Sequence, residues 1–496
     1  MQSVLDGPTV DGRNDMLKTA QPALPWLDDL ADDTPPGPRF RWGQLAMAMV
    51  CMATIANLQY GWTLFVNPFS ERYGWSHAAI QVAFSIFVLT QTWLGPLEGY
   101  LVDRFGPRPV VLVGGLLCAI GWVMNAFVDS LALLYVASAI AGTGAGAVYG
   151  TCVGSALKWF PDRRGLAVGL VVASFGAGSA LTVVPISMVI ASRGPEVAFL
   201  YFGLGQGLLV MLLALGLEDP NRLLPHVETP APPPHLRQSR RDYTPAQALR
   251  QPVFWVMYAI FVLVAAGGLM ATAQLVLIAR DFGIADAELH LAGLALPVLT
   301  FALALDRVLN GLSRLLFGGL SDRIGREQTM VIAFSLEAAA ILALYELGAQ
   351  PLGFVLLTGA LFLAWGEIYS LFPSVCADTF GSRFAAANAG FLYTAKGVAS
   401  LAVPLSSALV LATRDWHAVF LIACAMNVAA ALLAWFVLRP MRLRLLEEGA
   451  SAILVYEKSP VKHCYPSWDP SIPKAVGEQV SKRPGCVGVS AHNESS

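Results

Sequence analysis

The sequence predicts an all-α polytopic membrane protein with twelve transmembrane helices in two pseudo-symmetric six-helix bundles. Three observations support this fold class: too little charge for a soluble protein, twelve long apolar runs, and an internal repeat. Only 13% of the 496 residues are charged and 56% are apolar, whereas soluble domains carry about 25% charged residues. The mean hydropathy of +0.59 agrees. This composition excludes a soluble enzyme of several domains, because too few polar residues remain to cover their surfaces.

Twelve runs of the chain are apolar over the ~20 residues that a helix needs to cross a bilayer. We expect spans at 42–66, 79–101, 109–128, 131–157, 165–192, 197–217, 252–276, 293–320, 329–347, 352–376, 385–411 and 417–438. "PAPPP" and "RQSRRDY" lie between the sixth and seventh spans and indicate a linker. The expected regions are a tail 1–41, a first bundle 42–217, a linker 218–251, a second bundle 252–438 and a tail 439–496 that we expect to be mostly disordered.

The positions of Lys and Arg predict which side of the membrane each loop faces. If both termini are cytoplasmic, 25 of the 32 basic residues lie in inside segments and four lie in outside loops. The N-terminal tail has no apolar h-region, so we expect no cleavable signal peptide. The sequence thus predicts a multi-pass protein of the plasma (cytoplasmic) membrane, the inner membrane of a bacterial cell, with both termini inside.

The two halves share a motif at a constant spacing of 219 residues. "GYLVDRFGPR" begins at Gly99 and "GGLSDRIGRE" begins at Gly318. A repeat at fixed spacing indicates duplication, and the motif resembles the cytoplasmic signature of the major facilitator superfamily. The glycines permit close helix contact, and the acidic residues can cap helix N-termini or pair with Arg. We expect a cytoplasmic gate that breaks when the transporter opens inward, formed by Asp103, Arg104, Asp322 and Arg323.

Three basic residues fall inside predicted spans, where an unpaired cation is costly and normally faces a cavity. Arg314 lies about 12 Å from Asp322 along a helix, and Lys396 about 16 Å into its span. Both are therefore near the midplane, where such transporters bind substrate. Arg307 lies about 10 Å closer to the outside, beside Asp306, and is interpreted as part of a structural ion pair or as an outer-vestibule charge. Possible acidic partners for the midplane cations are Glu337 and Glu367.

Polar and aromatic side chains are predicted at the same depth, namely Gln59, Tyr60, Tyr149, Phe175, Trp365, Tyr369 and Tyr393. The segments "NLQYGWTLFVNPF", "NGLSR", "AWGEIYSLFP" and "YTAKG" resemble the oxalate:formate antiporter family. That resemblance implies that Arg314 and Lys396 bind the oxalate carboxylates. It also implies an aromatic cage to which Gln59, Tyr60, Tyr149, Trp365 and Tyr369 contribute. Phe175 and Tyr393 stand where the family has other aromatic residues.

The leading interpretation is a secondary active transporter that exchanges small carboxylate anions, first of all oxalate against formate, by alternating access. One alternative is a proton- or cation-coupled symporter of another small mono- or dicarboxylate, with Glu367 or Glu337 as the protonation site. A transporter-derived membrane sensor is the alternative from another class. The seven cysteines form no CxxC pair, and no nucleophile motif or phosphate loop is present, so we expect no enzyme, cofactor or metal. The expected partners are small carboxylates and the lipid bilayer, with no nucleic acid, and the protein is expected to act as a monomer.

Overall fold

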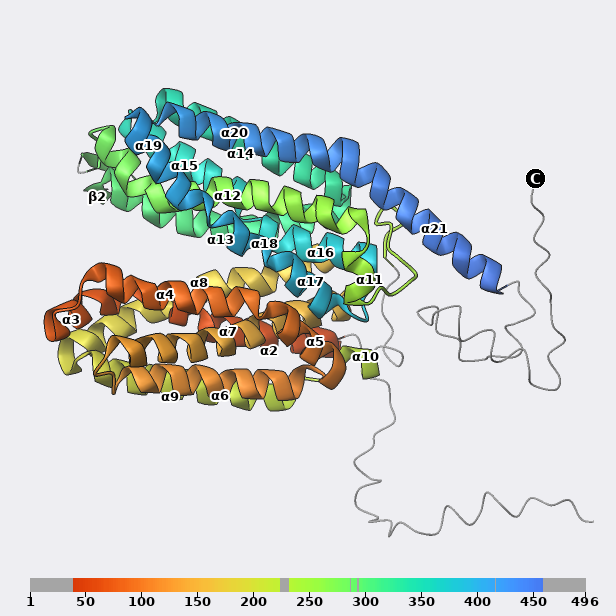
Figure 1. Ribbon diagram of the computed structural model, residues 1–496, viewed down its shortest axis with the longest axis horizontal. Coiled ribbons are helices and arrows are strands. Elements are labelled where there is room, and N and C mark those ends of the chain that lie inside the picture. The colour runs from red at the N-terminus through yellow and green to blue at the C-terminus, as the bar shows by residue number, and fades with distance from the viewer. Residues whose placement is uncertain (1–38, 224–231, 286, 292–293, 415, 458–496) are drawn as a thin grey trace, which may run out of the picture.

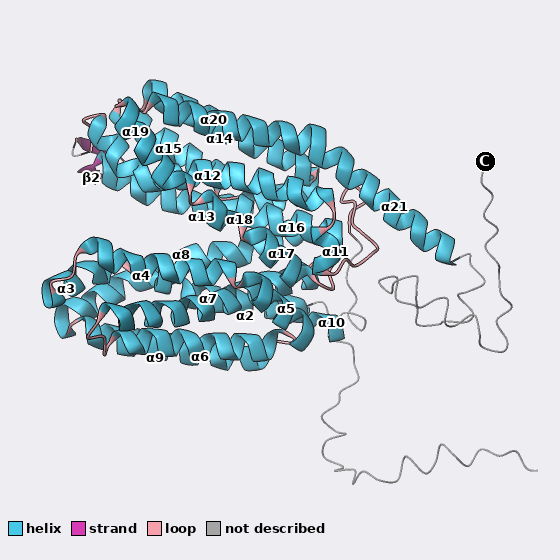
Figure 2. Cartoon of the chain, viewed as in Figure 1, coloured by secondary structure: helices cyan, strands magenta, loops and turns pink. Residues whose placement is uncertain are grey.

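The computed structural model describes residues 39–223, 232–285, 287–291, 294–414 and 416–457. Nearly all of this part of the chain is helical, and one short hairpin is its only sheet (Figure 2). The helices form two halves that lie side by side, the first drawn in red to yellow and the second in green to blue (Figure 1). The division into two helical halves agrees with the fold class that the sequence predicts.

The first half, called the N-half, packs six spans, two of which are broken into two helices each. Its helices are α2 (Arg39–Tyr60), α3 (Thr63–Tyr73), α4 (His77–Trp93), α5 (Gly95–Phe105), α6 (Pro107–Asn125), α7 (Leu131–Trp159), α8 (Arg164–Arg193) and α9 (Pro195–Gly216). Local sequence sets many of these limits. Ser76 and Ser130 cap the starts of α4 and α7 by accepting backbone N–H bonds. Proline, which has no backbone donor to lose, opens α6 and α9.

The second half, called the C-half, repeats this plan with more interruptions. Its elements are α12 (Pro252–Asp281), the strands β1 (Glu288–Leu291) and β2 (Leu294–Pro297), α13 (Val298–Ile324), α14 (Arg326–Leu347), α15 (Pro351–Trp365), α16 (Ile368–Phe380), α17 (Ala385–Tyr393), α18 (Ala395–Ala399), α19 (Ala402–Thr413) and α20 (His417–Leu432). A π-helical turn, η2 (Leu433–Leu438), joins α20 to α21 (Arg439–Glu457). The motif glycines Gly106 and Gly325 end α5 and α13 with φ of +80° and +104°, values that favour glycine.

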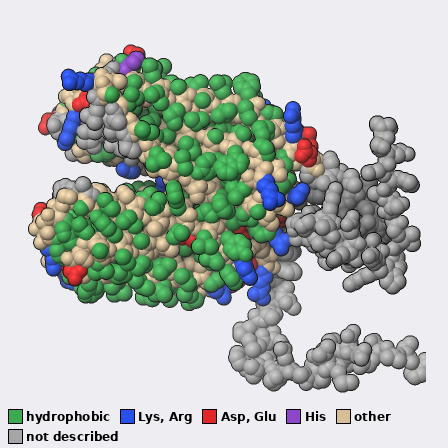
Figure 3. Space-filling view, in the orientation of Figure 1, with side chains coloured by type: hydrophobic (Ala, Val, Ile, Leu, Met, Phe, Trp, Pro, Cys, Tyr) green, Lys and Arg blue, Asp and Glu red, His purple; other side chains and the backbone are tan. Residues whose placement is uncertain are grey.

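Nine helices among the described residues are long and apolar enough to cross a membrane, and ten if the bent pair α4–α5 is one span. Their bend is 43°. The other two spans of the fold are α13, whose apolar sequence is interrupted by Asp306, Arg307 and Arg314, and the segments α17–α19, each of which is short. Hydrophobic side chains cover the flanks of both halves, and most charged side chains lie at the two ends (Figure 3). This distribution fits a molecule embedded in lipid between two aqueous phases.

Three regions differ from the sequence-based expectation. The eighth span was expected from residue 293, but residues 294–297 form strand β2, which pairs antiparallel with β1, and α13 begins at Val298. The tail from residue 439 was expected to be mostly disordered, yet residues 439–457 continue the preceding helix as α21, and the remainder lies outside the described residues. The linker contains two short helices, α10 (Pro220–Leu223) and α11 (Pro245–Leu249). The Ser239 and Tyr243 amides donate to the carbonyls of Asp378 and Phe380, so the linker packs on the C-half.

We call the end of the molecule that carries α10 and α11 the linker end, and the opposite end, which carries α3 and β2, the hairpin end (Figure 1). The space-filling view shows a cleft between the halves that opens toward the hairpin end (Figure 3). At the linker end the halves meet. A Cβ added to Gly318 of α13 would overlap the Gly165 carbonyl of α8, and one added to Gly99 of α5 would overlap the Ala386 carbonyl of α17. The glycines of the repeated motif therefore permit a close approach of the two halves.

Candidate functional site

Arg314 of the C-half makes a direct contact with the N-half. Its side chain projects from α13 and is only 5% exposed. The guanidinium donates to the Val172 carbonyl of α8 at 2.8 Å and to Oδ1 of Asn310 at 3.0 Å, and lies 5.0 Å from the centroid of the Tyr369 ring. Its Nε has no hydrogen-bond partner among the described residues. Arg314 is thus held in place by neutral groups and keeps its positive charge available to a ligand.

Lys396 of α18 brings a second cation to the same tyrosine. Its Nζ lies 5.4 Å from the ring centroids of Tyr369 and of Tyr393, and 3.3 Å from the Tyr393 hydroxyl. In the part of the chain that the structure describes, neither Lys396 nor Arg314 forms a salt bridge. The sequence named Glu337 and Glu367 as possible acidic partners, and the structure pairs neither with these cations. Two cations without counter-ions therefore converge on one aromatic ring.

Aromatic rings from both halves line the space around the cations. In the N-half, Phe175 of α8 contacts Tyr60 at the end of α2 and Tyr149 of α7, with ring centroids 5.5 Å and 5.7 Å apart. Tyr149 then stacks on Tyr393 of the C-half at 5.4 Å. The chain of rings crosses the boundary between the halves at this pair.

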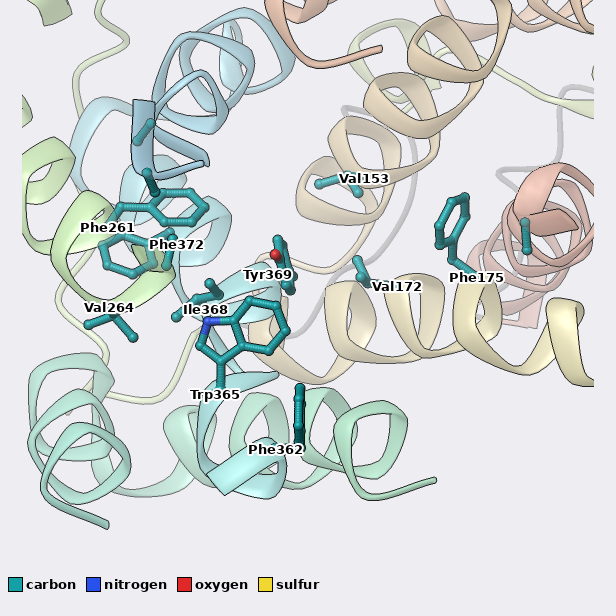
Figure 4. Packing of buried hydrophobic residues seen from close by; sticks show 14 of the residues in the cluster. Val153, Val172, Phe175, Phe261, Val264, Phe362, Trp365, Ile368, Tyr369 and Phe372 are labelled. Carbon is teal, nitrogen blue, oxygen red and sulfur yellow. The ribbon is translucent and has the colours of Figure 1, made fainter. Parts of the chain in front are cut away.

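The C-half continues the chain of rings from Tyr393. Tyr369 lies 6.2 Å from Tyr393 and 5.7 Å from Trp365. Phe261 of α12 packs 6.5 Å from Tyr369 and 6.4 Å from Tyr393. Figure 4 shows Trp365, Tyr369 and Phe261 on one side of this region, and Phe175 on the other. We call the set Tyr60, Tyr149, Phe175, Phe261, Arg314, Trp365, Tyr369, Tyr393 and Lys396 the cationic cage.

Breaks in the helices position several of these side chains. Tyr60 is the last residue of α2, Trp365 is the last of α15, and the α17–α18 break lies between Tyr393 and Lys396. At the α15–α16 break, a Cβ on Gly366 would lie 2.5 Å from the Asn310 carbonyl, so glycine lets the chain pass close to α13. Discontinuous helices near the midplane are a common way to build substrate sites in transporters.

Of the residues expected in the cage, Gln59 forms no side-chain hydrogen bond with the others that the structure describes. Gln59 precedes Tyr60 in α2 and is half-buried, but its side chain makes no hydrogen bond with another described residue. Phe261 and Asn310 were not expected. Phe261 lies in a uniformly apolar run, which carries no signal for a site. Asn310, four residues before Arg314 on the same helix face, could have been found from that spacing.

The motif aspartates lie in the contacts that close the linker end. Asp103 of α5 forms a buried salt bridge with Lys158 at 2.7 Å, and it accepts the Ala387 N–H of α17 at 2.9 Å. Asp322 of α13 accepts the N–H groups of Gly165 and Leu166, at 3.0 Å and 2.7 Å. Each aspartate therefore caps the N-terminus of a helix in the opposite half, which is a favourable place for negative charge.

Basic residues other than Arg104 and Arg323 form the ion pairs at the linker end. Arg326 pairs with Asp322 at 2.6 Å and with Asp378 at 2.8 Å, and Arg164 of the N-half pairs with Asp378 at 2.5 Å. Arg104, by contrast, is exposed and donates to the Tyr100 hydroxyl at 3.3 Å. Arg323 is also exposed and forms no ion pair with another described residue. We call Asp103, Lys158, Arg164, Asp322, Arg326 and Asp378 the gate residues.

Asp306 and Arg307 differ in exposure although they are adjacent in sequence. Asp306 is 3% exposed, whereas Arg307 is exposed and lies 5.9 Å from the centroid of the Tyr60 ring. No salt bridge joins the two side chains in the described structure. Of the two interpretations that the sequence left open for Arg307, the structure therefore favours the vestibule charge over the ion pair.

A helical membrane protein of two repeated halves, with a cationic site between them, has the architecture of a solute transporter. The family model described as Major Facilitator Superfamily matches residues 45–305 and 264–474. The chain therefore belongs to the major facilitator superfamily, and it is a membrane transporter and not an enzyme.

Relatives and solved structures agree with this assignment. The chain is 36% identical to the oxalate:formate antiporter of Oxalobacter formigenes over 81% of this chain and 92% of that protein. It is 25% identical to monocarboxylate transporter 13 of Bos taurus over 80% and 89% of the two chains. Among solved structures, a proton:xylose symporter superposes with a TM-score of 0.58 at 14% identity, covering 81% of this chain and 97% of the other. A second transporter, FucP in the outward conformation, gives 0.57 at 14% identity, covering 79% and 98%. At this identity the superpositions show the fold alone.

Proposed function

We propose that this protein exchanges small carboxylate anions across the membrane by alternating access, with oxalate against formate as the leading pair. The observation that carries the proposal is the convergence of Arg314 and Lys396 on the Tyr369 ring, at 5.0 Å and 5.4 Å, without an acidic partner. The 36% identity to the oxalate:formate antiporter supports the same substrate class. The monocarboxylate transporter among the relatives supports small organic acids more generally.

The chemistry of the cage suits a small dianion. Two carboxylates one bond apart carry two negative charges, which one Arg and one Lys neutralise. Arg offers a planar fork that matches a carboxylate, while Lys acts as a compact and movable point charge. Aromatic walls exclude water, and charge interactions strengthen as the local dielectric constant falls. Because an empty cage would leave the buried Arg314 and the half-buried Lys396 unneutralised, the carrier should reorient readily only with an anion bound, which favours exchange over uniport.

The orientation in the membrane is part of this proposal. We place the linker end, both termini and the gate residues in the cytoplasm, and the cleft toward the outside, in the inner membrane of a bacterial cell. The excess of Lys and Arg in the segments at the linker end supports this orientation. We also propose that the protein acts as a monomer, because one chain supplies every residue of the cage.

Counterflow in proteoliposomes tests the proposed function. The purified protein is reconstituted, the liposomes are loaded with formate or oxalate, and uptake of radiolabelled oxalate is measured. We expect uptake only into loaded liposomes, with competition by formate, acetate and malonate ranking the substrates. Oxalate uptake that does not depend on a counter-anion inside would reject exchange, and uptake no greater than in protein-free liposomes would reject the substrate.

A proton-coupled symporter is the second candidate, because Glu337 and Glu367 are carboxyl groups buried in the C-half without a cation. Glu337 of α14 and Glu367 at the α15–α16 break are both fully buried, and neither forms a salt bridge with a described residue. Glu337 lies beside the Asn427 amide where Gly267 of α12 approaches. Uncompensated charge at such positions is costly, so these groups favour the protonated form. An acid-outside gradient that drives oxalate uptake into liposomes without any counter-anion would support this candidate over exchange.

A further inference from the structure

Arg307 is a cation of α13 that approaches the N-half outside the cationic cage. It is exposed, and its guanidinium reaches from the C-half to within 5.9 Å of the Tyr60 ring centroid in the N-half. Seven residues separate it from Arg314, so it lies about 10 Å nearer the hairpin end on almost the same helix face. Asp306 is buried and forms no salt bridge with Arg307, so that carboxylate does not occupy the guanidinium donors.

A third polar residue lies between the two arginines on this face of α13. Asn310 follows Arg307 by three residues and precedes Arg314 by four. Its Oδ1 accepts a bond from Arg314, but its Nδ2 is buried and has no hydrogen-bond partner among the described residues. Nε of Arg314 is also without a partner there. Arg307, Asn310 and Arg314 therefore offer hydrogen-bond donors one after another along α13, in the direction from the hairpin end to the cage.

We propose that Arg307 and the Asn310 amide form an outer anion-binding site, which receives a carboxylate from the outside solution and passes it inward to Arg314. The inference rests on the proposed carboxylate transport. It goes beyond that transport because it assigns the first binding of the anion to Arg307 and Asn310, which are separate from the two cage cations. The Tyr60 ring holds the guanidinium by a cation–π contact, and the guanidinium donors remain free for a carboxylate.

Electrostatics predicts which kinetic constant this site controls. An exposed cation in a cleft concentrates anions near the mouth and raises their rate of entry, and salt weakens this effect. Anions that enter from the linker end reach the cage before they reach Arg307, so Arg307 cannot bind them first. Its removal should therefore affect the two faces of the membrane unequally.

The test measures oxalate exchange by the full chain in right-side-out and inside-out membrane vesicles. We call the KM for oxalate offered on the outside face of the membrane the outer KM, and that on the cytoplasmic face the inner KM. For Arg307→Gln we expect the outer KM to rise about three- to tenfold and to lose most of its dependence on ionic strength. The inner KM should stay within about twofold of wild type, and Arg307→Lys should restore most of the outer affinity. Arg193→Gln is the matched control. Arg193 also lies over a tyrosine, 5.8 Å from the Tyr201 ring centroid, but both residues belong to the N-half.

Each outcome of this test decides one claim. Wild-type exchange with an unchanged outer KM in Arg307→Gln would overturn the outer site and leave the proposed function intact. Equal increases of the outer and inner KM would also overturn it, because they would place Arg307 in the shared cage. An Arg193→Gln variant as impaired as Arg307→Gln would show a general surface effect and would likewise overturn it. Wild-type vesicles that exchange neither oxalate nor formate would reject the proposed function, and the carboxylate ligand of the outer site with it.

Discussion

Tyr149 of the N-half stacks on Tyr393 of the C-half, with 5.4 Å between ring centroids and 23° between the ring planes. The pair continues the ring contacts of each half, because Tyr149 also packs on Phe175 and Tyr393 on Tyr369. In alternating access the halves rock against each other around a central site. The cage is therefore complete only where the halves bring these two rings together.

Loss of either cation of the cage should nearly abolish dicarboxylate transport. Removing one partner of a buried, hydrogen-bonded charge pair costs about 2–5 kcal/mol, so we expect at least about a thirtyfold loss of exchange for Arg314→Gln and for Lys396→Gln. Initial rates of oxalate counterflow in proteoliposomes measure the loss. Equal amounts of folded protein in the membrane provide the control. Exchange close to wild type in a properly inserted variant would remove that residue from the site.

The charge of Lys396 should also determine selectivity. With Arg314 as the remaining cation, the cage of Lys396→Gln matches one carboxylate better than two, so we expect its preference to shift from dianions toward monoanions. Competition of unlabelled formate, acetate, oxalate and malonate against radiolabelled formate measures the shift. An unchanged order of inhibition would contradict the assignment of one cation to each carboxylate.

Exchange of oxalate for formate should respond to membrane voltage. Each cycle moves one net negative charge, which is worth about 2.3 kcal/mol at 100 mV, or about fiftyfold in the exchange equilibrium. A potassium–valinomycin potential imposed on the proteoliposomes should therefore change net oxalate accumulation, whereas oxalate self-exchange should show no net response. Hetero-exchange that ignores voltage would mean that a proton travels with the dianion, and the symport candidate would then lead.

The motif aspartates should control turnover more than affinity, because they hold the halves together at the linker end. A hydrogen bond to a charged group contributes about 1.5–3 kcal/mol, so Asp322→Asn should lower the maximal rate about tenfold and change KM little. This variant leaves Arg326 paired with Asp378 at 2.8 Å. Asp103→Asn instead leaves Lys158 buried and unpaired, so we expect a lower thermal stability as well. A large change of KM at an unchanged maximal rate would count against the gate.

Steric contact at the linker end offers an independent test of the same closure. A methyl group on Gly318 would overlap the Gly165 carbonyl, whereas one on Gly319 would meet only the Leu166 side chain, at 3.6 Å. We expect Gly318→Ala to hold the halves apart and reduce exchange about tenfold or more, since such overlap costs about 1–3 kcal/mol. Gly319→Ala should remain near wild type. Similar rates in the two variants would show that the close approach at Gly318 is not needed for transport.

Span positions could be predicted from the sequence wherever an apolar run has clear limits. The expected span 131–157 corresponds to α7, Leu131–Trp159, and 329–347 corresponds to α14, Arg326–Leu347. Strand β2 could not be predicted, because its sequence, LALP, is as apolar as the start of a span. Hydropathy reports the length of a run and not its conformation, so α13 was expected to begin too early.

The residue types of the cage could be predicted because intramembrane cations are rare and costly. The partners within the gate could not be predicted, since they depend on contacts between distant segments. Arg164 and Asp378 are 214 residues apart, and Asp103 and Ala387 are 284 residues apart. The sequence therefore led to Arg104 and Arg323, the nearest basic residues, whereas the structure uses Lys158, Arg164 and Arg326.

Equilibrium binding of oxalate to the purified protein tests most directly whether Arg314 and Lys396 together bind a dicarboxylate. Titration calorimetry compares the wild type, each Gln variant and the double variant Arg314→Gln/Lys396→Gln, with Arg193→Gln as the control for a lost surface charge. We expect saturable binding of one oxalate by the wild type and the control, weaker binding by each single variant, and none by the double variant. Binding of oxalate by the double variant with wild-type affinity would contradict the account.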